Sequence, residues 1–494
     1  MHFTSTRSLR DVTSAQAITR GLAEDGGLFI PKEFPKISGE LVNRMINMDY
    51  KARAREVLAL YLTDFSADEI ARSVETAYTG TFDQENPAPL VELRPGLNIL
   101  ELWHGPTCAF KDMALQLLPQ LLTISAGKTV PGRTIVILTA TSGDTGKAAL
   151  DGFADVPGTK IIVFYPQNGV SAMQKLQMVT QKGDNVAVCA IEGNFDDAQN
   201  GVKQIFADSE MKQYLDSRNM EFSSANSINF GRLAPQIVYY VSAYCDLLRQ
   251  GKLRRGERFN VTVPTGNFGN ILAAVYAREM GIPIGRLICA SNRNNILTDF
   301  IRTGIYDRNR PFYTTTSPSM DILISSNLER ILALLYGNDT AAVSNLMSQL
   351  AKTGRYAVSA EVLTRLQSEF FGGFCDDAGT AETIRQTFRN YHYLCDPHTA
   401  VALNVYEQYL RETGDDTPCV LASTASPFKF AAAVLSAVRP GILPADEFEM
   451  VTALAETTGL LVPKPLAELK NLPILHNGCV TKENMKNFIR SVLS

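Results

Sequence analysis

Several features that point to a particular class of protein are scarce in this sequence. It contains one tryptophan and five histidines, and its eight cysteines include no CxxC pair. Structural zinc sites and disulfide frameworks need such clusters, so we expect reduced thiols and no metal. A run of about 18 apolar residues, long enough for a membrane-spanning helix, is also missing. These absences argue against a metal-stabilised, disulfide-bonded or membrane-embedded protein.

The sequence also lacks a large excess of charge of either sign. The 47 basic and 51 acidic residues leave a net charge of −4, and no long basic run occurs. Nothing electrostatic therefore favours nucleic acid as a partner. The first residues, MHFTSTRSLRDVTSAQ, lack the apolar core of a signal peptide. We expect a cytoplasmic protein without nucleic acid or membrane partners.

The order of hydrophobic patterns predicts an α/β fold. The first 95 residues are helical and loop-rich, and afterwards short apolar strands alternate with helices, which is typical of parallel strands buried on both faces. The predicted strands are 134–139, 160–165, 185–191, 259–263, 287–291 and 419–422. We predict a helical N-terminal domain (1–95) and two wound parallel-sheet units (96–234 and 235–494).

Two loops have the position in which parallel sheets bind ligands, between the end of a strand and the start of a helix. The first is TATSGDTGK at 139–147, and the second is PTGNFGN at 264–270. Glycines, hydroxyls and free N–H groups at a helix start make an anion site. Each loop alone is equally compatible with an ordinary tight turn, because such turns favour the same residues.

Lys111 lies at the start of a predicted apolar helix, in the segment LWHGPTCAFKDMALQLL. The helix dipole and the apolar neighbours favour its neutral amine, which suits a lysine that forms a Schiff base. On position alone, however, a solvated lysine paired with Asp112 is the commoner situation.

The segments HGPTCAFKDMA, TSGDTG and PTGNFGN, in this order, closely resemble the threonine synthase family. These are pyridoxal-phosphate enzymes with the tryptophan-synthase-β fold, also called fold type II. The resemblance extends over almost the whole chain, and it is greatest to the long bacterial and fungal type. It implies two α/β units around a shared cofactor cleft.

The resemblance also implies roles for individual residues. Lys111 matches the catalytic lysine that carries pyridoxal 5'-phosphate, and Thr424 matches the hydroxyl residue opposite the pyridine nitrogen. The residues that match the cofactor-phosphate loop are Gly266, Asn267, Phe268, Gly269 and Asn270. Those that match the loop for the substrate α-carboxylate are Thr141, Ser142, Gly143, Asp144 and Thr145. We add Asn229 and Arg232, from NSINFGR, as candidates for binding the substrate phosphate.

Two positions depart from related sequences. Asp144 stands where related dehydratases have an asparagine that serves the phenolic oxygen of the cofactor. An ionised aspartate cannot donate that hydrogen bond, so its role stays open. Ser426 stands where the family usually has histidine, which weakens any catalytic role for this position.

The resemblance implies a carbon–oxygen lyase that converts O-phospho-L-homoserine and water into L-threonine and phosphate, the final step of threonine biosynthesis. It implies a small-molecule substrate, and we expect a monomer or weak homodimer. Two alternatives remain: a related phospholyase that releases a 2-keto acid, and a non-catalytic protein that binds pyridoxal phosphate. His392, Cys395 and His398 have no second ligand pair nearby, so a metal site there is not expected.

Overall fold

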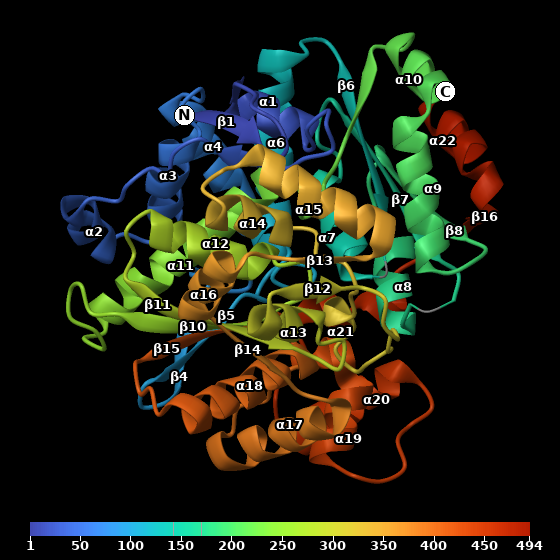
Figure 1. The fold of residues 1–494 in the computed structure, drawn as a ribbon. Coiled ribbons are helices and arrows are strands. Elements are labelled where there is room, and N and C mark those ends of the chain that lie inside the picture. Colours follow the sequence, from blue (N-terminus) through green and yellow to red (C-terminus); the bar gives the residue numbers. More distant parts are fainter. Residues whose placement is uncertain (142, 169) are drawn as a thin grey trace.

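The computed structural model describes residues 1–141, 143–168 and 170–494, and it contains two parallel sheets (Figure 1). The smaller sheet has five parallel strands, because long β-branched and apolar runs such as TIVILT bury both faces. In spatial order its strands are β16 (Gly478–Val480), β8 (Val186–Ile191), β7 (Thr159–Pro166), β6 (Thr134–Ala140) and β9 (Met220–Ser223).

The larger sheet has six strands, of which only the edge strand β4 is antiparallel to its neighbour. Their order is β14 (Phe370–Phe374), β11 (Ile284–Ser291), β10 (Phe259–Pro264), β15 (Cys419–Ser423), β5 (Leu97–Glu101) and β4 (Leu90–Arg94). The four strands β11, β10, β15 and β5 run in the same direction, so the loops that follow them meet at one edge of the sheet. The fold class predicted from the sequence, α/β with two parallel sheets, is confirmed.

The remaining strands form two small antiparallel sheets. β1 (His2–Ser5) lies between β2 (Val12–Thr13) and β3 (Phe29–Pro31), and β12 (Ile305–Asp307) pairs with β13 (Arg355–Ala357). The sequence pattern predicted none of these short strands, and the N-terminal region is therefore not purely helical.

The helices surround and connect the sheets. Those before the second unit are α1 (Ser14–Arg20), α2 (Gly39–Ile46), α3 (Tyr50–Tyr61), α4 (Ala67–Tyr78), α5 (Asp112–Leu115), α6 (Leu118–Thr129), α7 (Asp144–Phe153), α8 (Ala172–Val179), α9 (Phe195–Ala207), α10 (Ser209–Asp216) and α11 (Phe230–Arg249). Those that follow are α12 (Gly269–Glu279), α13 (Ile296–Thr303), α14 (Leu328–Leu335), α15 (Thr340–Thr353), α16 (Ala360–Glu369), α17 (Asp377–Tyr391), α18 (Pro397–Thr413), α19 (Ala431–Val438), α20 (Glu447–Thr458), α21 (Lys464–Ala467) and α22 (Met485–Leu493). Short 3₁₀ helices are η1 (Pro318–Met320), η2 (Pro427–Phe430), η3 (Leu469–Asn471) and η4 (Lys482–Asn484).

Three apolar clusters fill the space between these layers. The largest joins the N-terminal region to α11, α12 and one face of each sheet. A second lies between the larger sheet and α17–α20, below that sheet in Figure 1, and a third lies between the smaller sheet and α9, α10 and α22. The N-terminal region thus shares its core with the α/β body.

The predicted domain boundaries do not coincide with the sheets. β5, at the start of the predicted unit 96–234, belongs to the larger sheet, whereas β16, near the C-terminus, belongs to the smaller one. The boundary at 234 falls inside α11, which runs on through Pro235. Chain order therefore does not separate the two sheet units.

Among the described residues, no helix is long and apolar enough to cross a bilayer.

Candidate active site

Lys111 is positioned by the edge of the larger sheet. Its loop follows β5 and is joined to the end of β15, where the Phe110 N–H donates to the Thr424 carbonyl at 2.8 Å. Ala109 and Ala425 form an isolated bridge one residue away. α5 begins at the next residue, so the lysine is held between a strand end and a helix start.

The Lys111 side chain is 11% exposed and its Nζ lies 3.7 Å from Oδ2 of Asp144. Asp112 is occupied elsewhere, because its carboxylate accepts from the backbone N–H of Thr107 at 2.8 Å and from its hydroxyl at 2.6 Å. Burial raises the pKa of Asp112 to about 7. The alternative of a solvated lysine paired with Asp112 therefore does not agree with the structure.

The surroundings of Lys111 favour its neutral form. Burial lowers the pKa of its amine, the charges of Lys429 and Arg232 lower it further, and Asp144 opposes both. A buried amine with a lowered pKa is suited to act as a nucleophile or a base near neutral pH.

Lys429 is a site residue that the sequence analysis missed. Its side chain is fully buried, with Nζ 2.8 Å from Oδ1 of Asp144 and 2.8 Å from the carbonyl of Thr107. Two lysines thus share one carboxylate. Although burial alone would raise the pKa of Asp144, the charges of Lys429 and Lys111 lower it far below its usual range, so Asp144 is ionised. A lysine inside the apolar run SPFKFAAAV was the one available signal in the sequence.

The predicted carboxylate loop leads from β6 into α7. The Thr141 hydroxyl accepts from the N–H groups of Gly143 at 3.0 Å and Gly146 at 2.9 Å, which fixes the loop. Gly143 has φ +147°, and a Cβ there would lie 2.6 Å from the Gln174 side chain. Thr145 is half-buried in the first turn of α7, and Ser142 lies outside the described residues.

The second loop, between β10 and α12, has the features of an anion cradle. Carbonyls of Gly266 and Asn267 accept hydrogen bonds from Ser325 and Asn327, whereas no described residue accepts from the N–H groups of Gly266, Asn267 or Phe268. Phe268 has a left-handed conformation, φ +61°, directly before Gly269 opens α12. The loop therefore presents donors at a helix start.

Asn270 adds a side-chain donor at the same helix start. Its Oδ1 accepts from the Tyr240 hydroxyl, and its buried Nδ2 has no partner among the described residues. A buried unpaired donor is costly unless a ligand satisfies it. The backbone and this side chain thus fit a cofactor phosphate.

Thr424 and Ser426 follow β15, on the other side of Lys111. Thr424 is buried, and its hydroxyl makes no hydrogen bond within the described chain, so it is available to a ligand. The Ser426 hydroxyl accepts from the N–H of Phe428 at 3.4 Å and begins η2. Ser426 thus has a local structural contact, while Thr424 keeps a free polar group.

The two residues proposed for the substrate phosphate differ in their surroundings. Asn229 is fully buried and caps α11; its amide contacts the carbonyls of Ile18 and Ser224 and the N–H of Gly231. Both amide donors and the amide oxygen of Asn229 are thus occupied, which leaves no donor for a substrate phosphate.

Arg232, one turn into α11, has free donor capacity. It is 3% exposed and donates to the Ala225 carbonyl at 3.0 Å, but its Nε has no partner and no ion pair is formed within the described residues. Burial lowers the pKa of its guanidinium to about 10. A buried cation without a counter-ion is a binding site for an anion.

His398 joins the site through the segment before η1. Its Nε2 accepts from the Ser319 N–H at 3.2 Å, so Nδ1 carries the proton that is donated to Asp396 at 2.6 Å. Ser319 in turn lies 3.4 Å from Oδ2 of Asp144 through its hydroxyl. His398 therefore orients a loop of the site.

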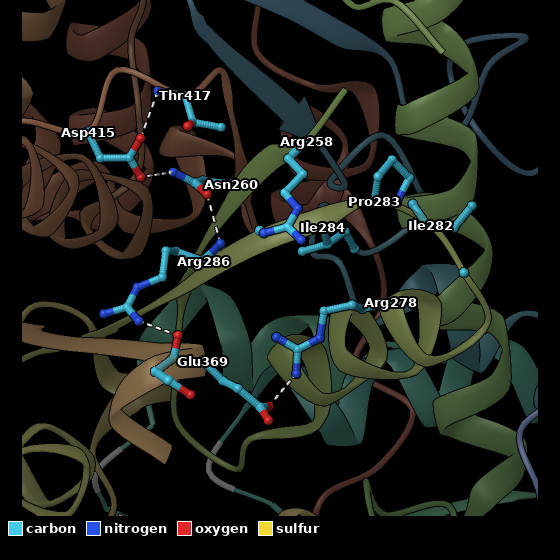
Figure 2. A pocket seen from close by; sticks show the side chains of 13 residues that line it. Arg258, Asn260, Arg278, Ile282, Pro283, Ile284, Arg286, Glu369, Asp415 and Thr417 are labelled. Atoms are coloured by element: carbon cyan, nitrogen blue, oxygen red, sulfur yellow. Dashed lines mark hydrogen bonds and ion pairs between the residues drawn. The ribbon is translucent and has the colours of Figure 1, made fainter. Parts of the chain in front are cut away.

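A separate open cavity of about 520 Å³ lies at the starts of β10 and β11, the opposite edge of the larger sheet (Figure 2). Arg278 is paired there with Glu369, and Arg286 donates to two backbone carbonyls. None of the predicted site residues lines it. The chemistry discussed above belongs to the edge with the loops.

Models of known protein families match most of the chain. The family model described as pyridoxal-phosphate dependent enzyme matches residues 82–424. The models for the threonine synthase N terminus and C-terminal part match residues 2–78 and 399–470. The chain belongs to the threonine synthase family. It is thus a member of a pyridoxal-phosphate-dependent enzyme family, with the cofactor expected from the sequence.

Two similar proteins show how much of the chain is shared with other family members. Threonine synthase of Pseudomonas aeruginosa is 38% identical over 435 residues, which cover 88% of this chain and 90% of that protein. Threonine synthase-like 1 of Homo sapiens is 42% identical over 438 residues, covering 86% of this chain. The chain spans only 58% of the length of that second relative.

Solved structures of the family have the same fold. Pyridoxal-phosphate-bound threonine synthase from Brucella melitensis is 36% identical with a TM-score of 0.88, covering 100% of this chain and 99% of that one. Threonine synthase from yeast is 32% identical with a TM-score of 0.89, covering 100% and 98%. The fold type predicted from the motifs is confirmed over the full length.

Proposed function

We propose that this chain converts O-phospho-L-homoserine and water into L-threonine and phosphate. Membership of the threonine synthase family supports the reaction class. The single observation that carries the choice of substrate is Arg232, a buried guanidinium without a counter-ion. Its charge lowers the pKa of the Lys111 amine, so Arg232 belongs to the same charged cluster.

The balance of charge in the site agrees with a substrate that carries two anionic groups. Among the described residues, Lys429 and Arg232 are the cations that act on the amine of Lys111, and Asp144 is the carboxylate that acts on it. The N–H groups of Gly266, Asn267 and Phe268 at the start of α12, which donate to no described residue, add donors. A phosphate and a carboxylate on one substrate, together with the phosphate of the cofactor, would use this capacity.

The site residues have separate roles in this proposal. Bound pyridoxal phosphate supplies an electron sink for negative charge that develops on the substrate carbons. Gly266, Asn267, Phe268, Gly269 and Asn270 would hold its phosphate, and Thr424 would face its ring nitrogen. The residues of loop 141–145 would bind the substrate carboxylate.

Lys111 is the catalytic residue of this proposal. It would hold the cofactor and, once released, move protons at neighbouring carbons on one face of the substrate. In the balanced reaction the phosphate leaves Cγ, the oxygen of water bonds to Cβ, and Cγ ends as a methyl group. Because the neutral amine is favoured by burial, it can accept the first of these protons.

The test measures the products formed from O-phospho-L-homoserine. We expect equal amounts of phosphate and threonine, and Lys111→Ala should form neither product and lose the visible absorbance of the cofactor. Release of phosphate with 2-ketobutyrate would identify a phospholyase instead. If the cofactor-loaded wild type releases no phosphate from O-phospho-L-homoserine, the chain is a protein that binds pyridoxal phosphate without this activity.

A second variant tests the phosphate site directly. Arg232→Leu should raise KM for phosphohomoserine about 10- to 100-fold, because a charge-assisted hydrogen bond contributes about 1.5–3 kcal/mol. Arg411→Leu, at an exposed position late in α18, is the control and should leave KM unchanged. An unchanged KM in Arg232→Leu would remove this assignment.

A further inference from the structure

The carboxylate of Asp144 is shared unequally between two lysines. Its Oδ1 contacts Lys429 at 2.8 Å and accepts from the Gln174 amide at 3.0 Å. Its Oδ2 lies 3.7 Å from Lys111 and 3.4 Å from the Ser319 hydroxyl. The short ion pair is therefore the one with Lys429, and Lys111 has the long one.

This asymmetry has a chemical consequence for Lys111. A lysine beside an unpaired buried carboxylate would be held as an ammonium ion, because an opposite charge within about 4–6 Å raises its pKa. An ammonium ion has no lone pair and cannot attack an aldehyde. The carboxylate next to Lys111 would thus block the amine unless another cation neutralised it.

We propose that Lys429 is a positioning residue that binds Asp144 as its own counter-ion and thereby keeps Lys111 an unprotonated amine. Lys429 reaches the site from η2, with Nζ also fixed by the Thr107 carbonyl, and it has no access to solvent. The amine nitrogen of Lys111 can then bond to the aldehyde carbon of the cofactor, and the aldehyde oxygen leaves as water. This inference rests on the proposed role of Lys111.

Other charged groups around the cluster act in the same direction or are already satisfied. Arg232, on α11, lowers the pKa of Lys111. Lys429 also acts on Asp112 and Cys108, but Asp112 is bound by Thr107 and burial raises the pKa of the Cys108 thiol to about 12. Asp144 is thus the carboxylate that decides the protonation of Lys111.

The test uses the full-length chain freed of cofactor and follows the attachment of pyridoxal phosphate by its visible absorbance across pH. In Lys429→Met the pH midpoint of the attachment rate should rise by about one unit or more, and the rate at pH 7 should fall about tenfold. Lys429→Arg keeps the charge and should keep the wild-type midpoint. A wild-type midpoint in folded Lys429→Met would overturn the inference.

Further variants separate this effect from a loss of structure. Asp144→Asn removes the carboxylate, so its midpoint should lie at or below that of the wild type, and the double variant with Lys429→Met should reverse the upward shift. An upward shift in Asp144→Asn would also overturn the inference. Lys252→Met, a partly buried lysine paired with Glu92, should leave the profile unchanged.

Failure of the proposed function gives a different result. If Lys111→Ala still acquires the cofactor absorbance, Lys111 does not carry the cofactor and the proposed function fails at its first step. If Lys111→Ala loses the cofactor absorbance but Lys429→Met keeps the wild-type pH midpoint, Lys111 keeps its role and Lys429 has no positioning role.

Discussion

Gly266 shows how tightly single residues determine the cofactor loop. Its φ is not in the left-handed region, so it is required for space: a Cβ there would lie 2.7 Å from the carbonyl oxygen of Ser319. Because that oxygen belongs to the backbone, relief requires a shift of the loop. Gly266→Ala should weaken pyridoxal phosphate binding by about tenfold or more, measured by titrating the cofactor-free chain.

Gly127 provides the matched control for this prediction. It lies in α6 with no atom near the position of a Cβ, and alanine is a better helix former than glycine by about 1 kcal/mol. Gly127→Ala should therefore stabilise the chain slightly and leave cofactor affinity unchanged. Equal affinities in Gly266→Ala and Gly127→Ala would show that the Gly266 loop is not in contact with the cofactor.

Site residues differ in how well the sequence predicts them. Lys111 and the two loops each lie in a local pattern of strand, glycine-containing loop and helix, but only the resemblance of their motifs to the threonine synthase family implied their roles. Lys429 and Ser319 were missed because they act through Asp144, which is distant in the chain, and no local pattern marks such a pair. The open role of Asp144 has the same cause, since its partners come from four separate segments.

Secondary-structure elements were likewise predicted where a local sequence pattern marks them and missed where they depend on distant segments. The long apolar strands of the sheet centres were predicted from the sequence, and in the structure α4 begins at Ala67 because Ser66 and Glu69 form a capping box. β14 and β16 were missed, since FFGGF contains two glycines and GCV has only three residues. Both lie at sheet edges, where pairing depends on distant segments.

α22 is the element that covers the outer face of the smaller sheet. Its Met485, Ile489 and Leu493 are buried in the cluster with α9 and the central strands. Ile489→Ala should reduce the free energy of unfolding by about 2–4 kcal/mol, because the cavity left at a buried site is only partly refilled. Urea unfolding measures this change.

A control lies on the same helix. Asn487 is exposed, so Asn487→Ala should change the free energy of unfolding by no more than about 0.5 kcal/mol. If both substitutions had equal small effects, α22 would not contribute to the core of the smaller sheet.

At the scale of the whole molecule, the N-terminal region and the α/β body form one core. Arg330 is buried and donates to the carbonyls of Phe29 and Ile228, while Glu329 binds Arg7 at 2.8 Å. Arg53 of α3 forms an ion pair with Asp246 of α11 at 2.7 Å, and both side chains are 2% exposed. These polar contacts, together with the shared apolar cluster, connect the cofactor site to the N-terminal region.

The ion pair between Arg53 and Asp246 allows a test of this connection. Among the described residues, Arg53→Met leaves the buried Asp246 carboxylate with Arg249 as its one remaining ion-pair partner, which should cost about 3 kcal/mol. Trp103, the only tryptophan, lies beside the site and donates to Ser423 at 3.1 Å, so its fluorescence reports unfolding of the α/β body. In Arg53→Met, the urea midpoints of unfolding measured by fluorescence and by circular dichroism should fall by the same amount. The double variant with Asp246→Leu should recover part of the lost stability. A Trp103 transition that stayed at its wild-type position would mean that the two regions unfold independently despite their common core.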